Sequence, residues 1–243
     1  MKHQPKLIHE IVAEAVATFA LVFMGTGALV ANHISGGAIT HVGVAITFGA
    51  IVAAMIYTFG HVSGAQMNPA VTLGFWASGA LPTRKVIPYI SAQLLGAMAA
   101  SGLLWLSFGN VANLGATLPL ADNASQSLVL EIVLTFVLMI VILGSGLDRR
   151  SPSGFAGVAI GLTVLLEAMC LGPITGASMN PARSFSPAVF SGAWAHHWVY
   201  WVAPIAGALL AVWVYRFIAP MAFPQRATPE KVAESLSGET HGH

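Results

Sequence analysis

Six long apolar stretches run through this chain and decide what it can fold into. Each is close to the roughly 20 residues that a helix needs to cross the hydrocarbon core of a bilayer. Only 8% of the 243 residues are charged, whereas about 25% are charged in a typical soluble domain. So few charges cannot cover a soluble surface, and we therefore predict an integral, multi-pass membrane protein. The predicted spans are 7–31, 39–60, 86–108, 127–147, 154–172 and 198–220.

Two further apolar segments, at 69–79 and 181–190, are too short to cross a bilayer. Each directly follows an asparagine, Asn68 or Asn180, and has proline as its first residue. Proline at the first helical position after a capping residue marks the start of a helix. We therefore expect two half-helices that enter the bilayer and return, since irregular backbone at membrane depth is tolerated where it lines a cavity.

Basic residues are divided unequally between the two sides of the six spans. Nine of the ten fall on one side, namely Lys2, Lys6, Arg84, Lys85, Arg149, Arg150, Arg216, Arg226 and Lys231. Because basic loops stay on the cytoplasmic side, we predict that both termini are cytoplasmic. We expect the membrane to be the plasma (inner) membrane. The tenth, Arg183, falls at membrane depth, where an arginine bonds backbone carbonyls or faces a water-filled cavity and indicates a functional site.

Three sequence landmarks occur twice in the same order, with nearly constant spacing. They begin at Glu14 and Glu131, at Gly43 and Gly157, and at Ser63 and Thr175, and the last of them ends in Asn-Pro-Ala both times. Each half holds three spans, an odd number, so the second half enters the membrane from the opposite side and the repeat is inverted. The predicted division is an N-terminal segment 1–6, a first repeat 7–115, an outer loop 116–126, a second repeat 127–220 and a polar tail 221–243.

These motifs resemble those of the major intrinsic protein family, the aquaporins and aquaglyceroporins. The resemblance covers about residues 7–220 and rests on Asn68-Pro69-Ala70, Asn180-Pro181-Ala182, Arg183 and the paired Glu14 and Glu131. It implies an all-α membrane fold of six transmembrane helices plus two re-entrant half-helices, and a homotetramer in which each subunit has its own pore. It also implies that the two asparagines donate to permeating molecules, that the two glutamates support the re-entrant loops, and that Arg183 and two positive helix ends exclude protons and cations.

Four positions set the narrowest part of the pore in this family. Spacing from the boxes assigns them here to Phe48, Ala168, Ala177 and Arg183. In the family, strict water channels have a histidine where this chain has Ala168, whereas glycerol channels have tryptophan, glycine and a second aromatic residue at the first three positions. The chain matches neither pattern, and its two alanines predict a wider, more apolar constriction than a water-only filter. We expect water and small uncharged solutes to pass, such as glycerol-like polyols, urea or metalloid hydroxides.

Other positions favour the alternative of a strict water channel. In the family, water selectivity accompanies the residue types found here at Ser184, Ala188, Tyr200 and Trp201. We give the constriction more weight, because it acts by steric contact with the solute. Glu167 leaves a question of register: it lies about 100° around a helix from Ala168 and is expected to face a neighbouring helix or loop, whereas a slip of one residue would put its carboxylate in the filter.

Other functional classes fit less well. A secondary transporter shares the inverted-repeat architecture, but apart from Arg183, Glu167 and the paired glutamates no charge lies at depth to bind a coupling ion. No nucleophile stands beside a base, and the lone Cys170 and scattered histidines give no metal-ligand cluster, so we expect no enzyme, metal or other cofactor. The net charge of +1 argues against a nucleic-acid partner. Asn123 begins a glycosylation sequon on the predicted outer side.

Overall fold

The computed structural model of this chain describes residues 5–148, 150–152, 154–220 and 222, and its regular elements among these residues are all helices. Its α-helices are α1 (Leu7–Ile34), α2 (Thr40–Phe59), α3 (Pro69–Ser78), α4 (Thr83–Phe108), α5 (Ala124–Ile142), α6 (Ala156–Thr175), α7 (Pro181–Ser191) and α8 (Val199–Ile218). A π-helical turn, Leu143–Leu147, extends α5, and two 3₁₀ turns, η1 (Ala112–Gly115) and η2 (Leu120–Asp122), connect α4 to α5. Six helices, α3 and α7 excepted, are long and apolar enough to cross a membrane.

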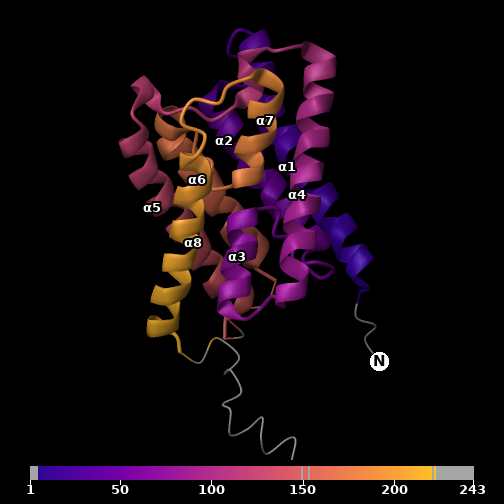
Figure 1. Cartoon of the computed structure of the whole chain (residues 1–243), viewed down its shortest axis with the longest axis vertical. Coiled ribbons are helices and arrows are strands. Elements are labelled where there is room, and N and C mark those ends of the chain that lie inside the picture. Colours follow the sequence, from indigo (N-terminus) through magenta and orange to yellow (C-terminus); the bar gives the residue numbers. More distant parts are fainter. Residues whose placement is uncertain (1–4, 149, 153, 221, 223–243) are drawn as a thin grey trace, which may run out of the picture.

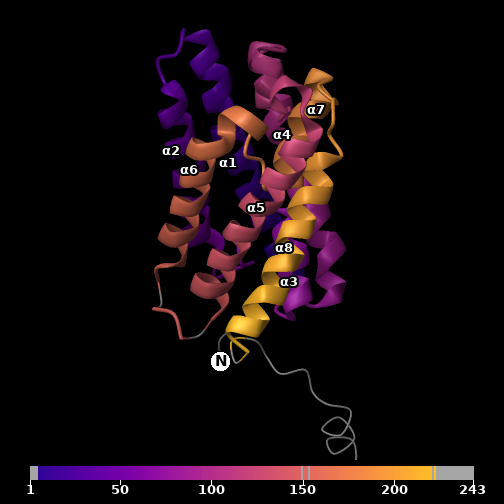
Figure 2. The same ribbon diagram turned by 90° about the vertical axis from the view of Figure 1, so that its left-hand side faces the viewer.

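The helices form one bundle that combines two halves of equal design (Figures 1 and 2). In the first half α1 packs along α4, and in the second half α5 packs along α8, while α2 and α6 join the halves. The short helices α3 and α7 lie within the bundle and extend toward its opposite ends (Figure 1). This is the all-α arrangement of six long helices and two half-helices that the inverted repeat predicts.

Glycines allow close approach at each of the three main helix pairs. A Cβ atom at Gly96 would lie 2.1 Å from the carbonyl oxygen of Ala15, and one at Gly207 would lie 2.4 Å from that of Ile132. Between α2 and α6, a Cβ at Gly49 would lie 2.4 Å from the carbonyl oxygen of Gly161. Because glycine has no Cβ atom, the two backbones can approach each other closely at these positions. Close approach of this kind lets membrane helices associate without a hydrophobic driving force between them.

The helix boundaries differ from the predicted spans by a few residues, and α6 shows why. The sequence predicts an end at residue 172, before Pro173, but α6 continues to Thr175 and ends at Gly176. Proline cannot donate a hydrogen bond to the carbonyl four residues earlier, and here the Nε2 atom of His41 donates to that carbonyl, of Met169, at 2.8 Å. The side chain from α2 thus satisfies the acceptor that the proline leaves open.

The start of α4 also lies earlier than predicted, because charged residues do not end the helix. The helix begins at Thr83, and Lys85 in its first turn binds Glu10 of α1 with Nζ 2.6 Å from Oε2. Tyr89 donates to the same carboxylate at 3.0 Å. Through these two contacts with Glu10, Lys85 and Tyr89 hold α4 against α1 near the end of the bundle where α1 begins.

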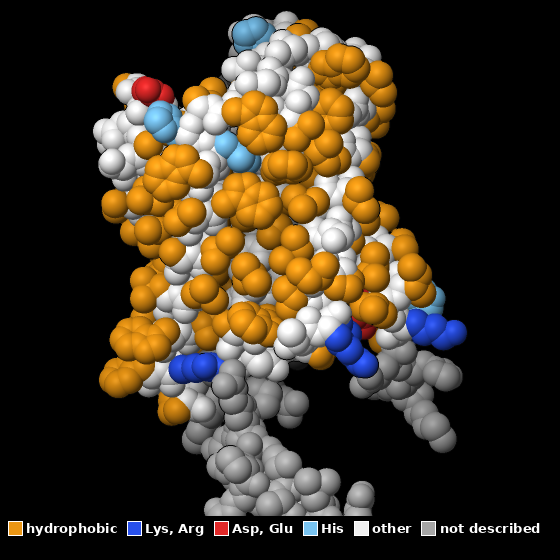
Figure 3. Space-filling view, viewed as in Figure 1, with side chains coloured by type: hydrophobic (Ala, Val, Ile, Leu, Met, Phe, Trp, Pro, Cys, Tyr) orange, Lys and Arg blue, Asp and Glu red, His pale blue; other side chains and the backbone are white. Residues whose placement is uncertain are grey.

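The surface matches a lipid solvent. Apolar side chains cover most of the face in Figure 3, and the visible Lys and Arg side chains lie at the end where α1 begins and α8 ends. Large apolar residues are highly exposed there and elsewhere, as with Leu106 at 76% and Phe217 at 86%. Of the basic residues predicted for one side, Lys2, Arg149, Arg226 and Lys231 lie outside the described residues, as does the predicted tail apart from residue 222.

Candidate functional site

Two asparagines link the re-entrant loops in the middle of the bundle. The Oδ1 atom of Asn68 caps α3 by accepting from the backbone N–H of Ala70 at 2.9 Å, and Asn180 caps α7 in the same way from Ala182 at 3.0 Å. The Nδ2 atoms cross over: Asn68 donates to the carbonyl of Met179 at 2.7 Å, and Asn180 to that of Met67 at 2.8 Å. Each amide carries a second N–H, and both asparagines line a cavity.

The paired glutamates, on α1 and α5, bind these loops through hydrogen bonds. Glu14 accepts from the hydroxyl of Ser63 and from the backbone N–H groups of Gln66 and Met67 at 2.7–2.8 Å, and Gln93 adds a fourth donor at 2.8 Å. Glu131 accepts at 2.8 Å from the hydroxyl of Thr175 and the backbone N–H groups of Ser178 and Met179. Both carboxylates are fully buried. Backbone donors that the half-helices leave unpaired are therefore satisfied inside the protein, as a low-dielectric interior requires.

Two cavities run from the loops toward opposite ends of the bundle. The larger, about 470 Å³, is lined by both asparagines, by the re-entrant loops and, toward the end where α1 begins, by Tyr57 and His61. The smaller, about 400 Å³, lies at the other end beside His33 and His41. Among the described residues, four line both cavities: Phe48, Ala168, Ala177 and Arg183. The residues that spacing selects for the filter thus lie together at the boundary between the cavities.

Arg183 is the only charged side chain among these four residues. It is 3% exposed, and its Nη1 atom donates to the carbonyl of Gly115 at 2.7 Å. Its guanidinium carbon lies over the ring of Phe48, 5.1 Å from the centroid, which is within range of a cation–π attraction. The Nε atom has no hydrogen-bond partner among the described residues. The boundary between the cavities therefore consists of the hydrogen-bonded guanidinium of Arg183, the aromatic ring of Phe48 and the small apolar side chains of two alanines.

The loop that holds Arg183 has an unusual backbone, which the sequence did not indicate. Ala112, Asn113, Leu114 and Gly115 all have positive φ angles, between 48° and 71°. Such angles cost roughly 1–2 kcal/mol for each residue with a Cβ atom, and strained backbone of this kind is typical of functional sites. The turn directs the carbonyl of Gly115 to Arg183. Gly115 and Asn113 are of residue types that tolerate this conformation, whereas Ala112 and Leu114 are not.

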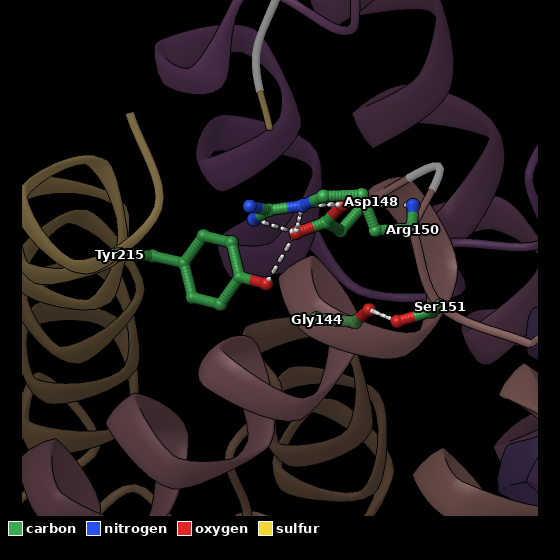
Figure 4. Close-up of polar contacts among 5 residues, drawn as sticks. All are labelled: Gly144, Asp148, Arg150, Ser151 and Tyr215. Atoms are coloured by element: carbon green, nitrogen blue, oxygen red, sulfur yellow. Dashed lines mark hydrogen bonds and ion pairs between the residues drawn. The ribbon is translucent and has the colours of Figure 1, made fainter. Parts of the chain in front are cut away.

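At the other end, a fastened loop borders the mouth of the larger cavity. Gly146 and Gly154 line this cavity on either side of Asp148, whose carboxylate accepts from Arg150 at 2.6 Å and from the hydroxyl of Tyr215 on α8 at 3.0 Å (Figure 4). Hydrogen bonds from Arg150 hold the pKa of Asp148 well below its usual range. The carboxylate therefore keeps its charge, and its hold on α8, at ordinary pH.

Several other residues singled out in the sequence lie away from the cavities. Ser184, Ala188, Tyr200 and Trp201 line neither cavity. Tyr200 instead donates to the carbonyl of Thr175 at 2.8 Å, which is a structural contact.

Glu167 also lines neither cavity, although Ala168 beside it lines both. It is 7% exposed, and neither of its carboxylate oxygens has a hydrogen-bond partner among the described residues. Two histidines differ in setting: His61 borders the larger cavity, whereas His196 pairs with Asp122 at 2.8 Å. His197 lines neither cavity and accepts from the indole N–H of Trp201 at 3.1 Å. The described residues include no group of three or more His, Cys, Asp or Glu that could hold a metal ion.

Comparison with known proteins identifies the family. The profile described as Major intrinsic protein matches residues 1–215. The chain belongs to the major intrinsic protein family. Among its relatives, Aquaporin NIP1-1 of Zea mays is 48% identical over 212 residues, which are 87% of this chain and 75% of that protein. Nodulin-26 of Glycine max is 44% identical over 212 residues, or 87% of this chain and 78% of that protein.

A solved structure shares the fold of this chain. The X-ray structure of the aquaglyceroporin from Plasmodium falciparum matches it with a TM-score of 0.80 at 24% sequence identity, over 89% of this chain and 99% of that one. Membership of the family makes the chain a membrane channel and not an enzyme. The two cavities and the boundary between them are accordingly the candidate path through this channel.

Proposed function

We propose that this channel conducts water and small uncharged solutes, such as glycerol-like polyols, urea or metalloid hydroxides, and excludes protons and ions. The observation that carries the proposal is the make-up of the boundary between the two cavities. Ala168 and Ala177 present only a methyl group each, so Phe48 and Arg183 alone supply bulk at this plane. A solute with a carbon chain can slide along the apolar side while its hydroxyl groups meet the free donors of Arg183.

Exclusion of cations follows from three positive groups along the path. The N-termini of α3 and α7 each carry a partial positive charge, and Asn68 and Asn180 at these ends line the larger cavity. Arg183 adds a full charge at the boundary. A cation would give up part of its hydration beside these three positive groups, whereas a neutral oxygen can accept from the asparagine N–H groups.

A strict water channel is the alternative that Ser184, Ala188, Tyr200 and Trp201 favour. These residues line neither cavity, so they cannot limit the size of a solute by direct contact. Relatives named aquaporins and a fold shared with an aquaglyceroporin leave room for both substrates. We therefore retain solute conduction as the proposal.

The test is stopped-flow light scattering on proteoliposomes that contain the purified chain. Osmotic gradients of an impermeant sugar measure water flow, glycerol gradients measure solute flow, and an enclosed pH dye measures proton leak. We expect water and glycerol permeabilities above those of protein-free liposomes, with the proton leak unchanged. Glycerol flow equal to that of protein-free liposomes would overturn the solute proposal and leave the strict water channel, and saturable, ion-dependent flow would indicate a transporter instead.

We further propose the surroundings in which the channel works. The basic residues gathered where α1 begins and α8 ends support a cytoplasmic location for both termini. We take the membrane to be the plasma (inner) membrane. The family supports a homotetramer with one pore in each subunit, built from repeats 7–115 and 127–220. Protease accessibility of a tagged C-terminus in sealed inside-out vesicles tests the orientation. The protein mass of the detergent-solubilised particle, after the mass of the bound detergent is subtracted, tests the tetramer.

A further inference from the structure

The ring of Phe48 occupies the space that a side chain at Gly25 would need. A Cβ atom built on Gly25 of α1 would lie 2.2 Å from Cε1 of Phe48, 2.5 Å from Cδ1 and 2.6 Å from Cζ. Carbon atoms in contact are normally about 3.5–4.0 Å apart, so the ring lies directly on the α-carbon of Gly25. Within α1 this glycine is buried, and it takes no part in the hydrogen bonds of the loops or of Arg183.

The other side of the same ring faces the boundary between the cavities. Phe48 lines both cavities, and its ring lies under the guanidinium of Arg183. The ring is thus held between the backbone of α1 and the open path. Any group that pushes the ring away from α1 moves it toward the path, where the neighbouring Ala168 and Ala177 leave space.

We propose that Gly25 is a positioning residue that sets the width of the constriction by letting the ring of Phe48 lie back against α1. This inference rests on the proposed conduction of small uncharged solutes and adds a fifth, indirect determinant to it. Gly25 does not touch the solute. It acts only through Phe48.

The size of the effect follows from the distances. A methyl group at position 25 requires the ring to retreat by more than about 1 Å to reach ordinary contact. The atoms in the way belong to the far end of a side chain and not to backbone, so the ring can yield while the helices keep their places. One added carbon atom in a fitted pocket changes discrimination by about tenfold, and we expect the glycerol-to-water permeability ratio to fall by about that factor in Gly25→Ala.

The matched control is Gly27→Ala, two residues further along α1. A Cβ atom there meets only Cδ2 of Leu104 on α4, at 3.4 Å, which is ordinary contact. Both substitutions add the same methyl group to the same helix, but only one is directed at the ring. The ratio should therefore stay at the wild-type value in Gly27→Ala.

The experiment is a double-mutant cycle in proteoliposomes, with stopped-flow measurement of water and glycerol permeability for wild type, Gly25→Ala, Phe48→Ala and the double variant. Because Gly25 acts through the ring, adding Gly25→Ala to Phe48→Ala should change the ratio by less than about twofold. A Gly25→Ala ratio equal to wild type, or an equal effect of Gly25→Ala with and without the ring, would overturn the inference.

Two further outcomes are decisive. A Gly25→Ala chain that fails to fold while the double variant folds would show that the ring cannot yield toward the path, and this also overturns the inference. If wild type itself passes no glycerol, the proposed solute conduction fails and the inference falls with it. If wild type passes glycerol and Gly25→Ala changes nothing, only the inference falls.

Discussion

Replacing Glu131 with glutamine keeps the shape of the side chain but removes one of its two acceptor oxygens. In the wild type, one oxygen accepts from Thr175 and Ser178 and the other from the backbone N–H of Met179, all at 2.8 Å. In the variant an NH₂ group faces the N–H of Met179. A hydrogen bond to a charged group contributes about 1.5–3 kcal/mol, and an unsatisfied buried donor costs about 1–3 kcal/mol.

The equivalent change in the first half, Glu14→Gln, should cost less. Gln93 lies beside Glu14, donates to it at 2.8 Å, and has a buried Oε1 atom without a partner. Rotation of the Gln93 amide turns this oxygen toward the new NH₂ group at position 14. The hydroxyl of Thr72, which accepts from Gln93 Nε2 at 2.9 Å in the wild type, then donates to the same oxygen. In the second half the corresponding position, four residues after Tyr200 as Gln93 is four after Tyr89, is Pro204, which offers no side-chain acceptor.

The two variants should therefore differ by one unsatisfied buried group, or about 1–3 kcal/mol. For a chain of this size that is a difference in Tm of roughly 2–12 °C, with Glu131→Gln the lower. The assay is thermal unfolding of the detergent-solubilised protein by circular dichroism, with both variants and wild type scanned at one rate. Equal losses, or a larger loss in Glu14→Gln, would refute the role of Gln93 and of the charged acceptor.

Two further substitutions test the ends of the path. Gly115 has a φ of 71°, and Gly115→Ala would put a Cβ atom 2.9 Å from Cδ1 of Leu29. We expect this variant to be less stable by about 1–2 kcal/mol. We also expect lower water permeability, because the carbonyl that anchors Arg183 moves. Gly79→Ala, which has φ of 87° and open space around it, should lower stability alone, and unchanged water flow in Gly115→Ala would contradict the anchor. Asp148→Asn should speed tryptic cleavage after Arg150 at pH 7. Because the pKa of Asp148 is lowered, the wild-type contact with Arg150 is complete at every pH above the ordinary aspartate pKa and weakens only as the pH falls through the lowered pKa. After correction for the activity of trypsin, wild type should therefore be cleaved at the same rate at pH 8 and at pH 6. A cleavage rate that rises within that range would contradict the assignment.

The architecture could be predicted from sequence because it depends on patterns that the sequence carries directly. Apolar length predicts the long helices, and the two Asn-Pro pairs predict where α3 and α7 begin, since proline fixes a helix start locally. Spacing from these boxes also selects the four residues between the cavities. Phe48, Ala168 and Arg183 lie on the regular helices α2, α6 and α7, in which residue number translates into position. Ala177 lies in the re-entrant loop, so the spacing also depends on the number of loop residues between each helix and its Asn-Pro pair.

The rest depends on contacts between distant segments. The end of α6 could not be predicted, because the carbonyl left open by Pro173 is satisfied by His41, which is 128 residues from Met169 in sequence. The anchor of Arg183 lies in a turn in which Ala112 and Leu114 also have positive φ angles, and the local sequence signals this conformation only at Asn113 and Gly115. The place of Gly25 beneath Phe48 depends on how α1 meets α2. These features require the packed structure, since no periodicity encodes them.

The most direct test of the central claim is the glycerol permeability of Ala168→His in proteoliposomes, measured with its water permeability. The added ring would stand at the boundary between the two cavities, opposite Phe48 and beside Arg183. We predict that glycerol permeability falls by at least about tenfold while water flow is largely kept. Glycerol flow that is unchanged in Ala168→His would contradict the claim that these four residues form the constriction through which the solute passes.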